Sequence, residues 1–199
     1  MMKKKLALMM LLTFGLSVAL MSCVTTQVKP TAANFVAPKI SLESFMVPFY
    51  DEYWYIAKSV KPTKGEAGDR GAFLPMTFVF NVKNTNAYPI RLEEIKYTVV
   101  FDKDFQMITS ADQLSNWIPA GMEEQVSVTT MITVRSALVG LLLANAVQLK
   151  AKGWDPWATL EKWWKGIPEG TVPVTLTECA FLFKADGVTK VYPFSVTAQ

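Results

Sequence analysis

Residues 73–82 are FLPMTFVFNV, and every second side chain from Met76 to Val82 is apolar. Successive side chains of an extended chain point to opposite faces, so this stretch predicts a strand with one buried face. Five further segments show similar alternation with β-branched or aromatic residues: 40–47, 90–101, 126–134, 172–183 and 188–196. Turn sequences such as Ala185-Asp186-Gly187 separate them. The pattern predicts a mostly β protein, an antiparallel β-sandwich.

One segment interrupts the strands. Residues 137–152, ALVGLLLANAVQLKAK, are apolar around most of a helical circumference, with Ser136 as a candidate cap and Gly153 as a stop. Asp155 followed by Pro156 is typical of a second helix start, and that helix should end near residue 166. We therefore expect an immunoglobulin/fibronectin-like sandwich with a two-helix insert, about 136–166, between late strands.

The insert is rich in tryptophan. Trp157, Leu160 and Trp164 are expected to share one face of the second helix. Trp163 lies beside that face and Trp154 just ahead of the helix, and the five residues together form the candidate apolar surface. The favoured interpretation is that these rings cap an open end of the sandwich and join its core. The alternative is an apolar surface for a lipid, an amphiphile or an envelope protein, since Trp beside lysine suits a membrane interface. A carrier of a hydrophobic ligand would need an apolar cavity under the insert, whereas an assembly module would need an exposed apolar patch.

The first residues are typical of a secretory signal. Lys3, Lys4 and Lys5 precede an apolar stretch, residues 6–20, that is shorter than a membrane-spanning helix. Its end, Leu20-Met21-Ser22-Cys23, resembles the lipobox of bacterial lipoproteins. The resemblance implies removal of residues 1–22 and attachment of acyl chains such as palmitate to Cys23, which would make the membrane a partner. An ordinary signal peptide that happens to contain a cysteine is the alternative.

The residues after Cys23 extend this hypothesis. Val24, rather than an aspartate, favours the outer membrane over the inner membrane of a bacterial cell envelope. Residues 23–38 are rich in Thr, Ala and Pro and predict a flexible tether. Residues 39–199 then form the domain, in which residues 50–60 suit either a strand or a loop and residues 61–71 suit a loop.

The net charge argues against a nucleic-acid partner. The whole chain carries +3, from 20 basic and 17 acidic residues. Loss of the three signal-peptide lysines leaves 17 of each sign, so the basic excess lies outside the domain. Nucleic-acid binding needs a clustered basic face. The sequence leaves the oligomeric state open.

The order of the motifs resembles the late embryogenesis abundant type 2 family, also called the water-stress-and-hypersensitive-response (WHy) domain. Residues 80–90, FNVKNTNAYPI, are similar to its Asn-Pro-Asn…Pro signature at Asn84, Asn86 and Pro89, with Thr85 in place of the usual proline. An Ile-Pro-Ala-Gly turn at 118–121 and a final YPFSV at 192–196 follow in the family's order. The resemblance implies a β-sandwich and a role in stress or desiccation protection. From the residues alone, Asn84 and Asn86 suit a tight turn better than a ligand site.

The residues offer little for catalysis. The chain has no histidine, which removes Ser-His and Cys-His pairs and every histidine-containing metal site. Cys179 lies in an alternating strand and is interpreted as a small core residue. Asp102 and Asp104 suit a turn. We therefore predict a protein that is not an enzyme and needs neither metal nor cofactor, with an enzyme using distant carboxylates as the minor alternative.

Overall fold

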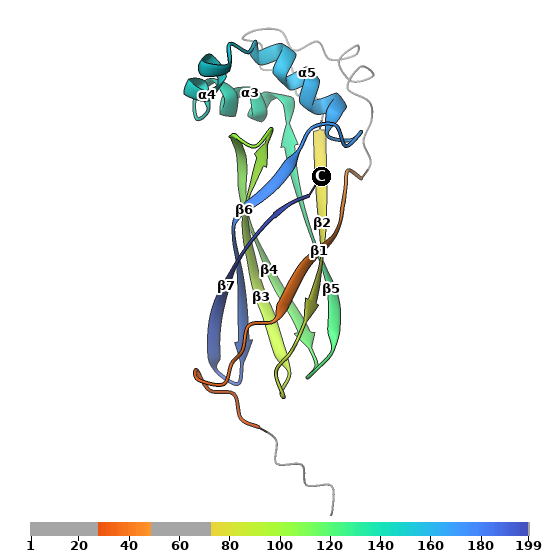
Figure 1. Cartoon of the computed structure of the whole chain (residues 1–199), viewed down its shortest axis with the longest axis vertical. Coiled ribbons are helices and arrows are strands. Elements are labelled where there is room, and N and C mark those ends of the chain that lie inside the picture. The colour runs from red at the N-terminus through yellow and green to blue at the C-terminus, as the bar shows by residue number, and fades with distance from the viewer. Residues whose placement is uncertain (1–27, 49–72, 199) are drawn as a thin grey trace, which may run out of the picture.

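The computed structural model describes residues 28–48 and 73–198. Within these residues, seven strands form two antiparallel sheets. One sheet has the order β1 (Lys39–Met46), β2 (Phe73–Lys83), β5 (Glu123–Thr133). The other has the order β4 (Phe105–Ile118), β3 (Ile90–Phe101), β6 (Val174–Ala185), β7 (Val188–Thr197). The sheets face each other in an elongated sandwich (Figure 1), which confirms the predicted fold class.

The core follows the alternation of the strands. The inward side chains of β2, from Met76 to Val82, are fully buried, and so are their counterparts on β3 and β6. Aromatic rings meet across the two sheets, as where Phe80 contacts Phe181 edge to face at 5.2 Å between centroids. Burying such a ring contributes about 1.5–3 kcal/mol, so the apolar stripe that identifies each strand also holds the two sheets together.

The strand connections gather at one end of the sandwich. The β2–β3 and β4–β5 loops pass from one sheet to the other there, and the β6–β7 hairpin turns at the same end (Figure 1). We call this end, with residues 28–38, 84–89, 117–122 and 186–187, the N-terminal pole. Asp186 and Gly187 have φ angles of 43° and 84°, which a two-residue hairpin turn requires, so the predicted turn is confirmed.

β4 has no counterpart among the predicted strands. It lies at the edge of its sheet and pairs only with β3. Phe105 and Ile118 at its two ends are buried. Between them the inward positions are only half-buried and include Ser110 and Asp112, and most outward positions are polar. An edge strand with this composition lacks the apolar stripe from which the other strands were predicted.

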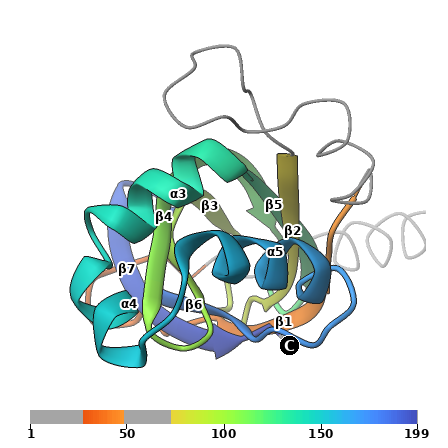
Figure 2. The ribbon, with the colours of Figure 1, turned by 90° about the horizontal axis from the view of Figure 1, so that it is seen from above.

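Three helices cover the opposite end: α3 (Val134–Leu142), α4 (Ala146–Lys152) and α5 (Pro156–Gly166). Viewed from above, they lie across the ends of the strands (Figure 2). We call these helices the helical cap. The prediction of two helices is wrong in one respect, because the first predicted helix is divided at residues 143–145. There the amide of Asn145 donates to the carbonyls of Gly140 and Gln106, and the second bond ties the break to β4.

The helix ends also differ in detail from the prediction. The first helix is capped by Thr133 rather than Ser136, and the two residues form a reciprocal capping box. Asp155 caps α5 as predicted, accepting from the backbone N–H of Ala158 at 2.9 Å. Among the helices that the structure describes, none is by itself long and apolar enough to cross a membrane. α3 and α4 pass that test together by length and composition, with an 80° bend between them.

The predicted flexible tether, 23–38, is wrong at its far end. Phe35 is buried against Tyr88 and Tyr192, and Pro38 is buried as well. Asn86 fixes Val36 through two hydrogen bonds, and this tertiary contact was not visible in the composition. The predicted signal peptide, Cys23, and the segments 50–60 and 61–71 lie outside the described residues.

Candidate functional site

The structure separates the five side chains proposed as an apolar surface. Leu160, Trp163 and Trp164 are fully buried, whereas Trp154 is half-buried and Trp157 is 38% exposed. The surface hypothesis is therefore wrong for the three buried residues. They face the open end of the sandwich because α5 turns this side toward β3 and β4, and the interpretation of the rings as core is confirmed for them.

Asp102 holds the buried face of α5 in place. The β3–β4 turn bends back at Asp102 and Lys103, whose φ angles are 48° and 71°. Its carboxylate accepts from Trp163 Nε1 at 2.6 Å and from Lys162 Nζ at 2.7 Å. The Trp163 ring also contacts Phe101 and Phe105 edge to face. The predicted turn is confirmed, and it serves as the docking point of the insert.

Trp154 lies at the edge of the contact between the helical cap and the β3–β4 turn. Its ring stacks on Phe105 at 5.5 Å and 17°, and Lys162 Nζ lies 4.6 Å from the centroid of the ring. Lys152 Nζ lies 5.1 Å away and pairs with Asp104 at 2.7 Å. The lysines that suggested a membrane interface, Lys162 and Lys165, are thus engaged within the domain: Lys162 with Asp102 and the Trp154 ring, and Lys165 with Glu161.

The most exposed apolar side chains of the helical cap lie instead on α3, on α4 and in the linker between them. Four of them fall within nine residues and form what we call the cap patch: Val139, Leu142, Leu143 and Val147. Leu143 and Val147 are 76% and 79% exposed. Residues 134–152 contain three basic residues and no acidic one. The cap patch is therefore apolar, with the exposed Lys150 of α4 three positions after Val147, whereas Lys152 is already paired with Asp104.

A cleft of about 440 Å³ lies beside the cap patch, between α4 and the end of β6. Most of its lining is polar, with Lys103, Asp104, Asn145, Gln148 and Glu178 among the residues. Glu178 sits in a β-bulge of β6 with φ of 53°. This lining differs from the apolar cavity that a carrier of a hydrophobic ligand would need.

At the N-terminal pole the predicted signature residues form turn architecture. Asn84 is fully buried, and its amide nitrogen donates to the carbonyls of Tyr88, Ile118 and Pro119. Asn86 accepts from Val36 N–H at 2.8 Å. The interpretation of Asn84 and Asn86 as turn residues is confirmed. Pro89 lines a neighbouring hollow, directly before β3.

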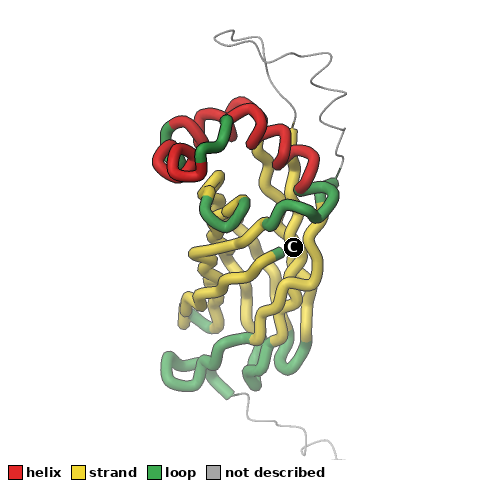
Figure 3. Tube along the Cα trace, turned by 45° about the horizontal axis from the view of Figure 1, so that its top comes forward, coloured by secondary structure: helices red, strands yellow, loops and turns green. Residues whose placement is uncertain are grey.

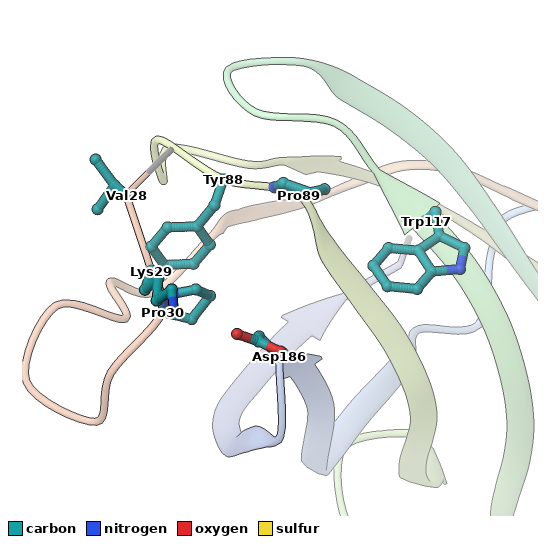
Figure 4. A pocket seen from close by; sticks show the side chains of 7 residues that line it. All are labelled: Val28, Lys29, Pro30, Tyr88, Pro89, Trp117 and Asp186. Atoms are coloured by element: carbon teal, nitrogen blue, oxygen red, sulfur yellow. The ribbon is translucent and has the colours of Figure 1, made fainter. Parts of the chain in front are cut away.

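That hollow has a volume of about 360 Å³ and contains a tryptophan that the sequence analysis did not select. Figure 4 shows Trp117 facing it, with Tyr88, Pro89, residues 28–30 and Asp186 around it. Trp117 lies near the end of β4 and is 56% exposed. Its ring carries the Arg91 guanidinium 5.5 Å from the centroid. The prediction relied on the density of tryptophan in the insert. It therefore did not select this isolated ring, which no sequence pattern marks.

One pair of adjacent carboxylates, Glu93 and Glu94, is engaged in ion pairs. Glu93 pairs with Arg91 and Lys184, and Glu94 pairs with Lys96 at 3.3 Å. Cys179 is buried as predicted, and burial raises the pKa of its thiol to about 11. Within residues 28–48 and 73–198, no group of three or more cysteine and acidic side chains lies close enough together to hold a metal ion.

Comparison with known proteins finds only distant structural similarity. No family model and no curated protein matches it. Among solved structures, a protein from Archaeoglobus fulgidus is 12% identical with a TM-score of 0.42, covering 79% of this chain and 94% of its own. A target of the Northeast Structural Genomics Consortium is 7% identical with a TM-score of 0.42, covering 81% and 85%. A protein described as ApaA from Bordetella pertussis is 7% identical with a TM-score of 0.38, covering 81% and 93%. At these values the similarity says nothing about function.

Proposed function

We propose that this chain is a lipid-anchored protein of the bacterial envelope that acts by binding rather than catalysis, through the cap patch. The exposure of Val139, Leu142, Leu143 and Val147 carries the proposal. The anchor rests on the lipobox-like Leu20-Met21-Ser22-Cys23, which follows three lysines and an apolar stretch. Cys23 precedes the first described residue by only five positions.

A partner protein suits the cap patch better than a hydrophobic ligand carried inside. The space under α5 is filled by the rings of Trp163, Phe101 and Phe105. The cleft beside the patch is mostly polar. Among the described residues, neither of these two places offers an apolar cavity to an internal ligand, whereas exposed apolar side chains are the expected mark of an assembly surface.

The position of the cap patch argues against contact with the membrane that would hold Cys23. β4 has 14 residues and spans about 45 Å at roughly 3.3 Å per residue. The helices lie at one end of it and the loops of the N-terminal pole at the other (Figure 3). A bilayer at the N-terminal pole therefore lies a full sandwich length from the patch. The exposed Lys150 of α4, close to the patch in the sequence, favours a partner with an acidic residue beside its apolar surface.

The resemblance to the WHy family suggests a physiological role for this binding. It implies protection of membranes or envelope proteins under water stress, and a protein that covers exposed apolar surface on its partner would fit that role. The resemblance carries this part of the proposal by itself.

The anchor is tested by Cys23→Ser in the full chain. We expect loss of the acyl mass from the mature N-terminus and release from the membrane fraction, because two or three acyl chains bind a bilayer far more strongly than the protein surface does. An unchanged membrane fraction with no acyl group on the wild-type chain would contradict the anchor.

The partner surface is tested by photocrosslinking in cells, from a photoreactive residue at position 143. We expect a discrete adduct whose protein component, once identified and purified, binds the full chain and loses binding to the Val147→Asp variant. Position 191 on β7, where Val191 is 58% exposed, serves as the control that should not crosslink to it. Adducts to lipid, or to a second copy of the chain, would contradict the proposed partner.

A further inference from the structure

The N-terminal pole carries exposed apolar side chains of its own. Trp117 and Met122 are 56% and 55% exposed, and Val28 and Val36 are exposed beside them. They come from two separate segments, 28–38 and 117–122, that the sandwich brings to one end. The Asn84 backbone N–H donates to the carbonyl of Met122 at 2.8 Å, which joins the β4–β5 turn to the β2–β3 loop. The sandwich core therefore positions these side chains without burying them.

Cationic groups accompany the exposed apolar residues. Arg91 lies 5.5 Å from the centre of the Trp117 ring and also pairs with Glu93, and Lys29 lines the same hollow. Lys83 is exposed at the end of β2, opposite the exposed Glu123 of β5. Asp186 is the acidic member of the hollow (Figure 4). An exposed indole with a guanidinium beside it is the combination found at bilayer interfaces, where the ring lies among headgroups and the cation meets phosphate.

The distance to Cys23 limits what this end can face. Val28 is five positions after Cys23, and a fully extended chain covers roughly 3.3–3.6 Å per residue, so the two lie within about 18 Å. Acyl chains on Cys23 would therefore keep the bilayer surface close to this pole and far from the helical cap.

We propose that the N-terminal pole docks on the phospholipid headgroups of the anchoring bilayer, with Trp117 and Met122 entering the interface. This inference rests on the proposed acylation of Cys23. The docked sandwich stands upright on the membrane, and the cap patch points away from it. The Trp-rich insert is then the far end of the molecule, and membrane contact belongs to the single tryptophan of β4.

The test uses the acylated full chain, purified from membranes and reconstituted in vesicles of phosphatidylethanolamine and phosphatidylglycerol. The Trp117→Cys variant receives an environment-sensitive thiol label, since Cys23 carries lipid and Cys179 is buried. The Leu143→Cys variant is the matched control, because its exposed position lies on the cap. Brominated phospholipids then act as quenchers that reach only labels in the interface.

We expect the label at position 117 to be blue-shifted and quenched, and the label at position 143 to stay solvent-like. The Met122→Cys variant should behave like Trp117→Cys, which guards against a local effect of losing the indole. Solvent-like labels at both 117 and 122 on an acylated, vesicle-bound chain would overturn the docking inference and leave the anchor standing. An unacylated Cys23, seen by mass spectrometry, would overturn the anchor and the inference together.

Discussion

The side-chain oxygen of Asn84 accepts two hydrogen bonds from Asn86, one from its backbone N–H at 2.9 Å and one from its amide at 3.0 Å. The amide of Asn84 faces the other way and donates to three backbone carbonyls. One buried residue thus joins the β2–β3 loop to the end of β4. Asn86, held by it, secures Val36 of the N-terminal segment.

Replacement of Asn84 should destabilise the whole domain. Asn84→Ala leaves three carbonyls without their side-chain donor in a buried site, and each unpaired group costs about 1–3 kcal/mol. We expect the free energy of unfolding to fall by about 3 kcal/mol or more, measured by urea denaturation. Thr85→Ala, at the exposed neighbour with one long bond to Ala37, is the control and should change little. Equal effects of the two substitutions would contradict the assigned role.

Replacement of Asn86 should act locally. Asn86→Ala removes both bonds to Val36, so the segment around Phe35 should open more often while the sheets stay intact. Hydrogen exchange should show faster exchange at the Val36 amide and unchanged exchange in the middle of β3. Unaltered protection of Val36 would mean that packing of Phe35 alone secures the segment.

Asp102 should matter far more than Asp104, although both lie in one turn. Asp102→Asn weakens the charged acceptor of Trp163 Nε1 and Lys162, and we expect a loss of about 1.5–3 kcal/mol. Asp104 is half-exposed and pairs only with Lys152, so Asp104→Asn should cost about 1 kcal/mol or less. Denaturant midpoints of both variants give the comparison, and similar losses would contradict the docking role of Asp102.

Two tryptophans of α5 should contribute very differently to the stability of the domain. Trp163→Ala opens a cavity under the helical cap and should lower the free energy of unfolding by about 3–5 kcal/mol. Trp157→Ala, at a partly exposed ring, should cost about 0.5–1 kcal/mol. Thermal unfolding followed by near-ultraviolet circular dichroism measures both, and a large loss for Trp157→Ala would place that ring in the core.

Cys179 should be unreactive in the folded chain. Burial raises the pKa of its thiol from 9.0 to about 11, so thiol reagents at pH 8 should label it only after unfolding. The unfolded chain ionises first, so this thiol's contribution to stability is complete below pH 9 and is lost as pH rises toward 11. Stability curves of the wild-type chain and Cys179→Ala should therefore converge or cross over that range. Rapid native labelling would contradict the buried assignment.

Local pattern was sufficient wherever the core lies on one face of a strand. β2, β3, β6 and β7 were predicted close to their ends, because alternation of apolar residues reports directly on a buried face. β4 was not predicted, because this strand is held by pairing with β3 and lacks the apolar stripe on which the prediction depends. The break between α3 and α4 was not predicted for a similar reason, since the Asn145 amide that holds it bonds to Gln106, 39 positions away.

The candidate surfaces also show what local sequence can and cannot predict. Tryptophan density selected Trp163 and Trp164, which are buried, and passed over Trp117, which is exposed. Composition reports how many rings a segment holds, but exposure depends on what the folded chain places against each ring. The carboxylate of Asp102 and the phenyl rings of Phe101 and Phe105 cover Trp163, and all three come from a turn about 60 residues earlier.

The sequence by itself determined the sandwich class, the turn role of Asn84 and Asn86, and the burial of Cys179, because each depends on short-range periodicity or on the bonding capacity of one side chain. Only the tertiary structure decided which apolar residues stay outside, and that two groups of them lie at opposite ends of the sandwich. Exposure results from long-range packing between segments far apart in the chain, and a local pattern carries no record of it.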